Sequence, residues 1–197
     1  WHNGRLLFVG RLKRRKGCSW FVNEVLPLLP DDLTLQVAGT VWDQAEFAAL
    51  DNPRVEYLGP LKGGKLLAAY ASALAVVVPN IDLANGEFEG FGLVAAEAAA
   101  AGGLVLAAET AGLKEAVIGG ETGFHLPPGD AAAWASKIVE LRDWSDEERA
   151  VFINRAMSTA ISVFSWKRVA LQTEDIYVQE WLARVPSGWR KTSRESD

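Results

Sequence analysis

Short apolar runs alternate with helical stretches along most of the chain, and this alternation restricts the fold more than any other feature. Strands are predicted at residues 5–9, 33–38, 55–58, 74–78, 104–107 and 123–126. Helices are predicted at residues 17–29, 43–50, 64–72, 91–101, 113–118, 130–141, 145–160 and 165–183. Strands this apolar, separated by helices, are typical of a parallel sheet that helices cover on both faces. We therefore predict an α/β fold with a Rossmann-like, doubly wound parallel sheet and helices on both faces.

Glycines and polar residues follow several of the predicted strands. In a doubly wound sheet, ligands bind at the carboxyl ends of the strands, near a switch point in the strand order. The segments expected at that edge are Gly10-Arg11, Gly39-Thr40, residues 80–90 and residues 108–112. We therefore expect the functional residues to come from these segments.

Composition excludes several other classes of protein. The 197 residues are 49% hydrophobic and 23% charged, which is typical of a globular domain with one core. A net charge of −5 argues against nucleic acid as a main partner, and the basic cluster at residues 13–16 is too short to change that. The single cysteine, Cys18, excludes an internal disulfide and fits a reducing compartment. The absence of a signal peptide and of an apolar run of about 20 residues favours a cytoplasmic location, with the inner face of a membrane left open.

The segment G-E-F-E-G-F-G-L-V-A-A-E carries the clearest chemistry in the chain. It places Glu89 before a glycine turn and Glu97 inside a helix that is otherwise almost all alanine and valine. A carboxylate in such a helix is unfavourable to bury, so it is normally paired or faces a ligand. The backbone N–H groups at the start of this helix could hold an anion, and the two carboxylates could accept hydrogen bonds from hydroxyl groups. The segment therefore suits a ligand that carries both negative charge and hydroxyl groups.

This segment resembles the signature of the retaining glycosyltransferases of family four, which have the two-domain GT-B fold. The run F-V-G-R-L-K-R-R-K-G is similar to the family's other signature, with Gly10-Arg11 followed by Lys16-Gly17. Further similar runs, in the family's order, are V-E-Y-L-G, A-Y-A-S-A-L-A-V-V-V-P, A-G-L-K-E, G-F-H-L-P-P-G-D and F-S-W-K-R-V. The resemblance extends from about residue 5 to residue 181 and covers the nucleotide-binding half. Because the chain opens at Trp1 without an initiator methionine, we expect it to be cut from a longer protein that contains the other half.

The resemblance implies a role for each matching residue. Arg11 and Lys16 would bind the diphosphate of a nucleotide sugar, and Glu89 would contact the donor sugar and stabilise positive charge as the glycosidic bond breaks. Glu97 would accept hydrogen bonds from the ribose hydroxyls. The remaining substrate-binding residues would be Gly10, then Gly90, Phe91, Gly92, Leu93 and Val94 around the phosphates, and Gly39, Tyr57 and Leu58 at the nucleobase.

Simpler interpretations remain for several of these residues. Arg11 and Lys16 could be solvated loop residues, as we expect for Lys13, Arg14 and Arg15, and Glu97 could form a buried ion pair. The loop at residues 80–88 departs from the family pattern, and its Asp82, Asn85 and Glu87 either touch the sugar or only solvate the loop.

Other ligand motifs are poorly supported. The run G-P-L-K-G-G-K-L is close to a P-loop, but Leu66 replaces the Ser or Thr that would bind magnesium. G-F-G-L-V-A fits a dinucleotide fingerprint but does not follow a strand. His2 and His125 have no companions that would make a zinc site.

We therefore predict the carboxyl-terminal, donor-binding domain of a retaining GT-B glycosyltransferase over residues 1–183, followed by a disordered polar tail at residues 184–197. The donor would be a UDP-, GDP- or ADP-sugar, with no cofactor and no metal. The partners expected are this donor and an amino-terminal acceptor domain of the same protein, with no nucleic acid. The isolated chain should bind the donor without efficient transfer.

Two alternatives stay open, a nucleotide-sugar epimerase of GT-B architecture and a non-catalytic nucleotide-binding or docking module. The base, the sugar, the acceptor and the linkage also stay open, as do the oligomeric state and any membrane association of the whole protein.

Overall fold

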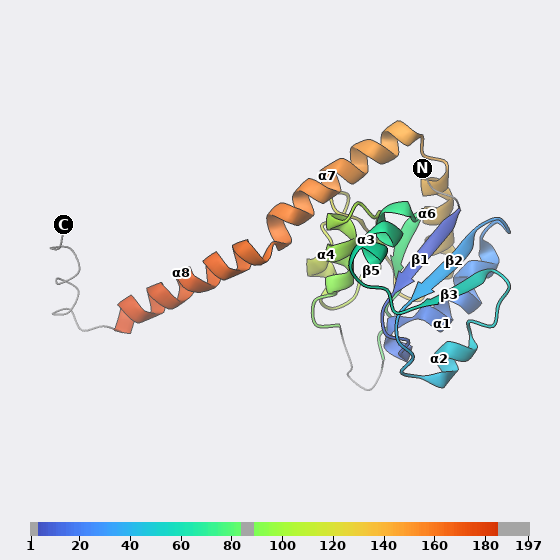
Figure 1. The fold of residues 1–197 in the computed structure, drawn as a ribbon, viewed down its shortest axis with the longest axis horizontal. Helices are drawn as coiled ribbons and strands as arrows, with labels where there is room; N and C mark the ends of the chain where they lie inside the picture. Colours follow the sequence, from blue (N-terminus) through green and yellow to red (C-terminus); the bar gives the residue numbers. More distant parts are fainter. Residues whose placement is uncertain (1–3, 84–88, 185–197) are drawn as a thin grey trace. The chain divides into compact units, whose positions relative to one another are not determined.

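The computed structural model describes residues 4–83 and 89–184 (Figure 1). The chain divides into two compact units, the first comprising residues 1–160 and the second beginning at Ile161. The first unit contains the whole sheet. The prediction of one domain over residues 1–183 stays a prediction. The predicted tail at residues 184–197 lies outside the described residues, except for Arg184.

Six strands of the described residues form one parallel sheet in the order β3-β2-β1-β4-β5-β6. Their bounds are Arg5–Val9 (β1), Thr34–Ala38 (β2), Val55–Gly59 (β3), Ala75–Val78 (β4), Val105–Ala108 (β5) and Phe124–Leu126 (β6). Every residue of β4 and β5 is buried, because helices cover both faces of a parallel sheet. The predicted parallel α/β fold is therefore confirmed. The strand order reverses between β1 and β4, where Leu6 pairs with Ala75 and Phe8 with Val77.

The helices fall into two groups, as right-handed crossover connections require when the strand order reverses. The first group contains α1 (Cys18–Trp20) and α2 (Gln44–Ala48), and α6 (Ala131–Arg142) packs against the turns that continue α1. The second group contains α3 (Gly63–Ser72), α4 (Leu93–Ala100) and α5 (Leu113–Ala116), which pack in sequence against one another. Figure 1 shows α3 and α4 on one side of the sheet and α1 and α2 on the other.

The continuous helix predicted at residues 17–29 is wrong in detail. After α1 the chain passes into a π-helical turn, η2 (Phe21–Val25), and then a 3-10 turn, η3 (Leu26–Leu28). Pro27 explains the change, because it has no N–H to donate and its ring crowds the preceding turn. The irregular stretch still buries Phe21, whose ring meets the fully buried Trp134 of α6 edge to face.

Helix α7 (Asp146–Phe164) leads into the second unit, which contains α8 (Trp166–Arg184). The predicted helix start at Ser165 is confirmed, because the Ser165 hydroxyl accepts a hydrogen bond from the Arg168 backbone N–H at 3.3 Å. None of the described residues of α8 is buried, and Trp166, Tyr177 and Trp181 are exposed. No helix in the described part of the chain is both long enough and apolar enough to span a membrane.

Candidate functional site

A cavity of about 380 Å³ lies at the carboxyl ends of β1 and β4, where the strand order reverses. This is the edge at which a doubly wound sheet binds its ligands. The residues that line the cavity come from β1 and its following loop, from β4 and its following loop, and from the start of α4: Phe8, Val9, Gly10, Arg11, Lys16, Val78, Asn80, Glu89, Phe91, Gly92, Leu93 and Val94. The predicted residues Gly10, Arg11, Lys16, Glu89 and Phe91 to Val94 are thus brought together around one space.

Gly17 brings the two loops of the cavity into contact. Its φ of 71° is left-handed, and a Cβ added there would overlap the carbonyl group of Pro79. The loop after β1 therefore lies against the loop after β4, and the Ile81 backbone N–H donates to the Arg15 carbonyl at 3.0 Å. This close approach places Arg15 and Lys16 opposite Glu89.

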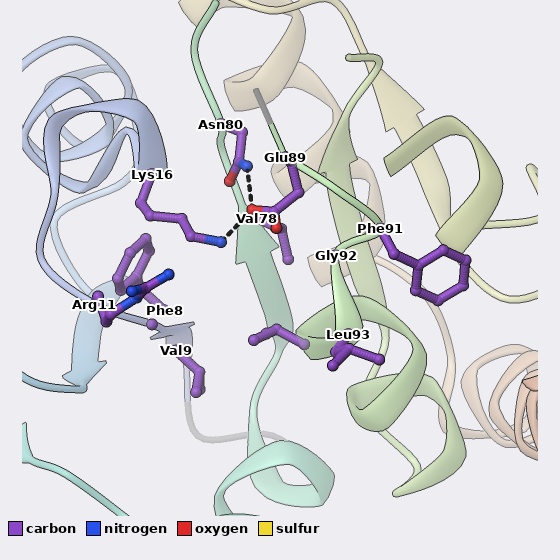
Figure 2. A pocket seen from close by; sticks show the side chains of 12 residues that line it. Phe8, Val9, Arg11, Lys16, Val78, Asn80, Glu89, Phe91, Gly92 and Leu93 are labelled. Atoms are coloured by element: carbon purple, nitrogen blue, oxygen red, sulfur yellow. Dashed lines mark hydrogen bonds and ion pairs between the residues drawn. The ribbon is translucent and has the colours of Figure 1, made fainter. Parts of the chain in front are cut away.

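Three side chains donate hydrogen bonds to one oxygen of Glu89, and Figure 2 shows two of them, Lys16 and Asn80. Lys16 Nζ donates to Glu89 Oε2, as do Arg15 Nη1 at 2.9 Å and Asn80 Nδ2 at 3.0 Å. The side chain of Arg15 is only 12% exposed, so the expectation that Arg15 is solvated is wrong. A charge pattern cannot show this contact, because it depends on the turn at Gly17.

The electrostatics of this cluster favour the ionised carboxylate. Burial alone would raise the pKa of Glu89, but hydrogen bonds and charge from Lys16, with Arg15 and Asn80, lower it to about 2. The pKa of Lys16 is also lowered, chiefly because its burial outweighs the raising effect of Glu89, and the charges of Arg15 and Arg11 lower it by smaller amounts. Arg15 and Lys16 contact one carboxylate, and Arg11 lines the same cavity, so positive charge exceeds negative charge there and the cavity is suited to a further anion.

Arg11 lies at the rim of the cavity and is exposed. Its guanidinium stacks over the Trp42 ring, 4.8 Å from the ring centroid, and it makes no ion pair with any described residue. Trp42 is itself 61% exposed, and its indole N–H donates to Thr40 Oγ1 at 3.2 Å. Stacking on an aromatic face restricts a guanidinium while leaving its N–H groups available to an anion. Trp42 was not singled out by the sequence, because its contact with Arg11 is made between two loops.

The amino end of α4 forms another wall of the cavity. Gly92, with a φ of 87°, precedes the first helical residue, and no described side chain caps the start of the helix. A helix start carries unsatisfied N–H groups and a partial positive charge. The predicted anion-binding segment therefore borders the same space as Lys16 and Arg11.

Glu97 occupies the exposed face of α4 and does not line the cavity. It forms no ion pair with the described residues, so the buried ion pair that was the simpler interpretation is not found. The reason is that α4 buries its alanines on the other side. Leu93 lines the cavity and is 54% exposed, and Glu97 lies one helical turn further along the same face.

The residues predicted at the nucleobase gather beside the cavity and do not line it. The Tyr57 hydroxyl donates to the Gly39 carbonyl at 2.8 Å, and the Tyr57 ring packs edge to face on Phe47. Leu58 follows on the same strand, β3. The strand pairing brings this group next to the first loop, since the Gly10 backbone N–H donates to the Ala38 carbonyl at 2.9 Å.

The remaining candidates contribute less to the site. Asp82 is exposed in the loop after β4, whereas Asn85, Glu87 and His2 lie outside the described residues. The ring of His125 lies 3.3 Å from the Leu113 carbonyl. Within residues 4–83 and 89–184, no group of three or more His, Cys, Asp or Glu side chains could hold a metal ion.

Asn80 was not named as a site residue, although the sequence places it two residues after a predicted strand, at the ligand-binding edge. It lines the cavity and is 3% exposed. Its position after the buried strand β4, at a known ligand edge, is the signal that could have identified it.

Comparisons with known proteins agree with this geometry. The model of the family "Glycosyl transferases group 1" matches residues 3–143. A D-inositol 3-phosphate glycosyltransferase from Corynebacterium aurimucosum is 31% identical over 199 residues, which covers 94% of this chain and 45% of that protein. Sucrose-phosphate synthase from Thermosynechococcus elongatus is similar in structure, with a TM-score of 0.73 and 30% identity over 91% of this chain and 46% of that one.

Anabaena Alr3699/HepE, solved in complex with UDP and glucose, has a TM-score of 0.75 over 90% of this chain and 48% of that chain. Its identity of 22% means that this likeness shows the fold alone. The chain spans less than half the length of each of these relatives.

Proposed function

The chain belongs to the glycosyl transferases group 1 family, and from this premise we propose that it is the donor-binding half of a retaining glycosyltransferase of family four. The donor is a nucleoside-diphosphate sugar, and the acceptor domain belongs to the same, longer protein with the two-domain GT-B fold. The relatives that share this family and span about twice the length support the two-domain proposal.

The observation that carries the proposal is the grouping of Arg11, Lys16 and the start of α4 around one cavity. A diphosphate needs positive charge held in place, and a guanidinium, an ammonium and backbone N–H groups supply it in complementary ways. These groups would stabilise the negative charge that develops on the departing diphosphate, because they are aimed at that charge before the reaction begins. No step needs a metal or another cofactor.

Glu89 is proposed to act on the sugar side of the same cavity. Its pKa of about 2 keeps it ionised at neutral pH, so it can accept hydrogen bonds from sugar hydroxyls and stabilise positive charge near the breaking glycosidic bond. Lys16 forms an ion pair with Glu89, so a bound diphosphate would share Lys16 with this carboxylate. We also propose that the whole enzyme transfers the sugar with retention of its configuration.

Glu97, Gly39, Tyr57 and Leu58 are proposed to bind the nucleoside. Glu97 is exposed on the same face of α4 as Leu93, where its two carboxylate oxygens can accept from a ribose diol. The group around Gly39 and Tyr57 adjoins the first loop and would contact the base, partly through backbone atoms. We propose that the protein works in the cytoplasm, with the inner face of a membrane left open.

Calorimetric titration of the chain with UDP, GDP and ADP tests this function. One of the three should bind, and Glu97→Ala should weaken that binding roughly tenfold or more because a hydrogen bond to a charged group is lost. UDP is the first probe, since a structural relative was solved with UDP and glucose. Glu140→Ala serves as the matched control, because Glu140 is an exposed carboxylate on α6 that pairs with Lys137.

Failure of all three nucleotides to bind at millimolar concentration, in this chain and in the longer protein, would contradict the proposal. Equal affinity for a nucleoside diphosphate and every sugar-diphosphate would instead favour a non-catalytic nucleotide-binding module. Interconversion of a nucleotide sugar without an acceptor would favour the epimerase alternative.

A further inference from the structure

Asn80 carries an unusual combination of burial and unsatisfied polarity. It follows β4 through Pro79, lines the cavity and is 3% exposed. Its Nδ2 donates to Glu89 Oε2 at 3.0 Å, but its buried Oδ1 has no hydrogen-bond partner among the described residues. A buried carbonyl oxygen without a donor is unfavourable and rare in folded proteins, so this one requires an explanation.

The orientation of the Asn80 amide follows from its neighbour. An ionised carboxylate only accepts hydrogen bonds, so the NH₂ group of Asn80 must face Glu89. Turning the amide over would place two acceptors against each other. Oδ1 is therefore the atom that remains for a ligand, and Figure 2 shows the amide pointing toward Glu89 and Lys16 at the cavity.

Glu89 presents a second acceptor of the same kind. Lys16, Arg15 and Asn80 all donate to Oε2, and no donor from the described ranges reaches Oε1. Among the described residues, two acceptor atoms at the cavity thus have no donor, Asn80 Oδ1 and Glu89 Oε1, and their side chains are hydrogen-bonded to each other. Because Arg15 and Lys16 hold the same carboxylate, the spacing of the two acceptors is set before any ligand arrives.

Only a part of the ligand that donates hydrogen bonds can pair with these two acceptors. The oxygens of a diphosphate at neutral pH accept hydrogen bonds and cannot donate, so they cannot satisfy Asn80 Oδ1. Sugar hydroxyls donate, and neighbouring hydroxyls on one ring are spaced for two adjacent acceptors.

On the basis of the proposed function, we infer that Asn80 is a specificity-determining residue, whose Oδ1 accepts a hydrogen bond from a donor-sugar hydroxyl beside the one that Glu89 Oε1 accepts. The site therefore prefers a donor sugar with a hydroxyl at both positions. A sugar that lacks one of them leaves a buried acceptor unpaired, which is how a polar site rejects a deoxy analogue.

The alternative role for Asn80 is purely structural, because its Nδ2 also holds Glu89. The two roles differ in one respect. If the role of Asn80 is structural, Asn80→Ala should weaken the binding of every sugar equally. If Asn80 Oδ1 accepts a sugar hydroxyl, Asn80→Ala should not change the affinity for the one analogue that lacks that hydroxyl.

The test is a titration of wild type and Asn80→Ala with UDP, UDP-glucose and the monodeoxy analogues of UDP-glucose. If the chain binds GDP rather than UDP, the titration uses GDP, GDP-mannose and its monodeoxy analogues. If it binds ADP, the titration uses ADP, ADP-glucose and its monodeoxy analogues. We expect Asn80→Ala to leave UDP affinity within about twofold and to weaken UDP-glucose roughly tenfold, the usual size for a lost hydrogen bond. One monodeoxy analogue should bind wild type and Asn80→Ala equally. Gln36→Ala, which removes an amide that contacts Glu56 away from the cavity, should change none of these affinities.

Several results would overturn the inference. They are an equal loss for all sugars in Asn80→Ala, no loss for any sugar, or a loss for UDP itself. If Asn80→Ala does not fold, the wild type alone tests the inference. Because each of the two acceptors pairs with one hydroxyl, the wild type should bind at least two of the monodeoxy analogues more weakly than UDP-glucose. Failure of the wild type to bind UDP, GDP and ADP would instead overturn the proposed function, and this inference with it.

Discussion

At the scale of the residue, the charge on Glu89 links the stability of the site to pH. Its pKa is lowered from 4.5 to about 2, since hydrogen bonds and charge from Lys16, Arg15 and Asn80 outweigh burial. A carboxylate whose pKa is lower in the folded state stabilises the fold at pH values above its unfolded pKa. That stabilisation is lost as the pH falls from about 5 toward 2, and a shift of this size corresponds to about 3 kcal/mol.

We predict that the free energy of unfolding of Glu89→Gln will lack this part of the acid dependence. The glutamine cannot ionise, so the stability difference between wild type and Glu89→Gln should shrink as the pH falls from 5 toward 2. Urea unfolding at a series of pH values between 2 and 7 measures it.

Lys16→Met supplies the matched comparison for this prediction. It removes the largest influence that lowers the pKa of Glu89, so the acid-dependent loss of stability should be smaller than in wild type and should be complete at a higher pH. Wild-type and Glu89→Gln curves that stay parallel throughout this range would show that Glu89 is not held by the cluster.

The sequence predicts where site residues lie when a motif fixes the local geometry, and it does not predict contacts that cross between loops. Arg11, Lys16 and Glu89 meet at one cavity because glycines and strand ends place them there. Arg15 was expected to be solvated and instead contacts Glu89, because Gly17 lets two distant loops touch. The position of Glu97 depends on how α4 turns its faces, which an almost uniform run of alanines does not reveal.

At the scale of the element, the turn at Gly17 connects the fold to the site. Its positive φ and its contact with the Pro79 carbonyl group exclude any side chain. We predict that Gly17→Ala will lower the free energy of unfolding by clearly more than the roughly 1–2 kcal/mol that a left-handed backbone costs an alanine. It should also weaken nucleotide binding, because Lys16 moves away from the cavity. Chemical denaturation and calorimetry on the same samples measure both effects.

Gly129→Ala is the control for this prediction. Gly129 has a similar φ of 75°, and nothing lies within 4 Å of an added Cβ. It should therefore show the backbone penalty alone and keep the affinity for nucleotide. Equal loss of stability in the two variants would mean that the loops do not approach as closely as the structure shows.

The elements themselves were largely predictable, because apolar strands separated by helices permit few other arrangements. The predicted strands all occur within a residue or so of their expected bounds, from β1 to β6. The stretch at residues 17–29 was harder, since its apolar periodicity continues through a π-turn and a 3-10 turn. Periodicity reports which side of a segment is buried, and it does not report the pitch of the backbone.

At the scale of the whole molecule, the cavity contains groups suited to one substrate of a reaction that needs two. Arg11, Lys16, Glu89 and the start of α4 line this cavity, and in the proposed function they bind the charge and the hydroxyl groups of a nucleotide sugar. The curated relatives are about twice as long as this chain. An acceptor must approach the donor from the side that the sheet edge leaves open, and in the proposed GT-B enzyme the other domain supplies that side.

We therefore predict that this chain binds the donor without transferring its sugar efficiently. A saturating nucleotide sugar should raise the unfolding midpoint, because a ligand at 100 times its Kd adds about 2.7 kcal/mol to the stability of the folded state. Release of nucleoside diphosphate from the same sample should stay close to the rate without protein, since in the proposed enzyme the acceptor side belongs to the other domain. Thermal unfolding with the donor, followed by quantification of the released nucleoside diphosphate, measures both quantities. Rapid turnover by this chain alone would show that the acceptor site lies within these residues, whereas turnover only in the two-domain protein would show that catalysis requires the closed cleft.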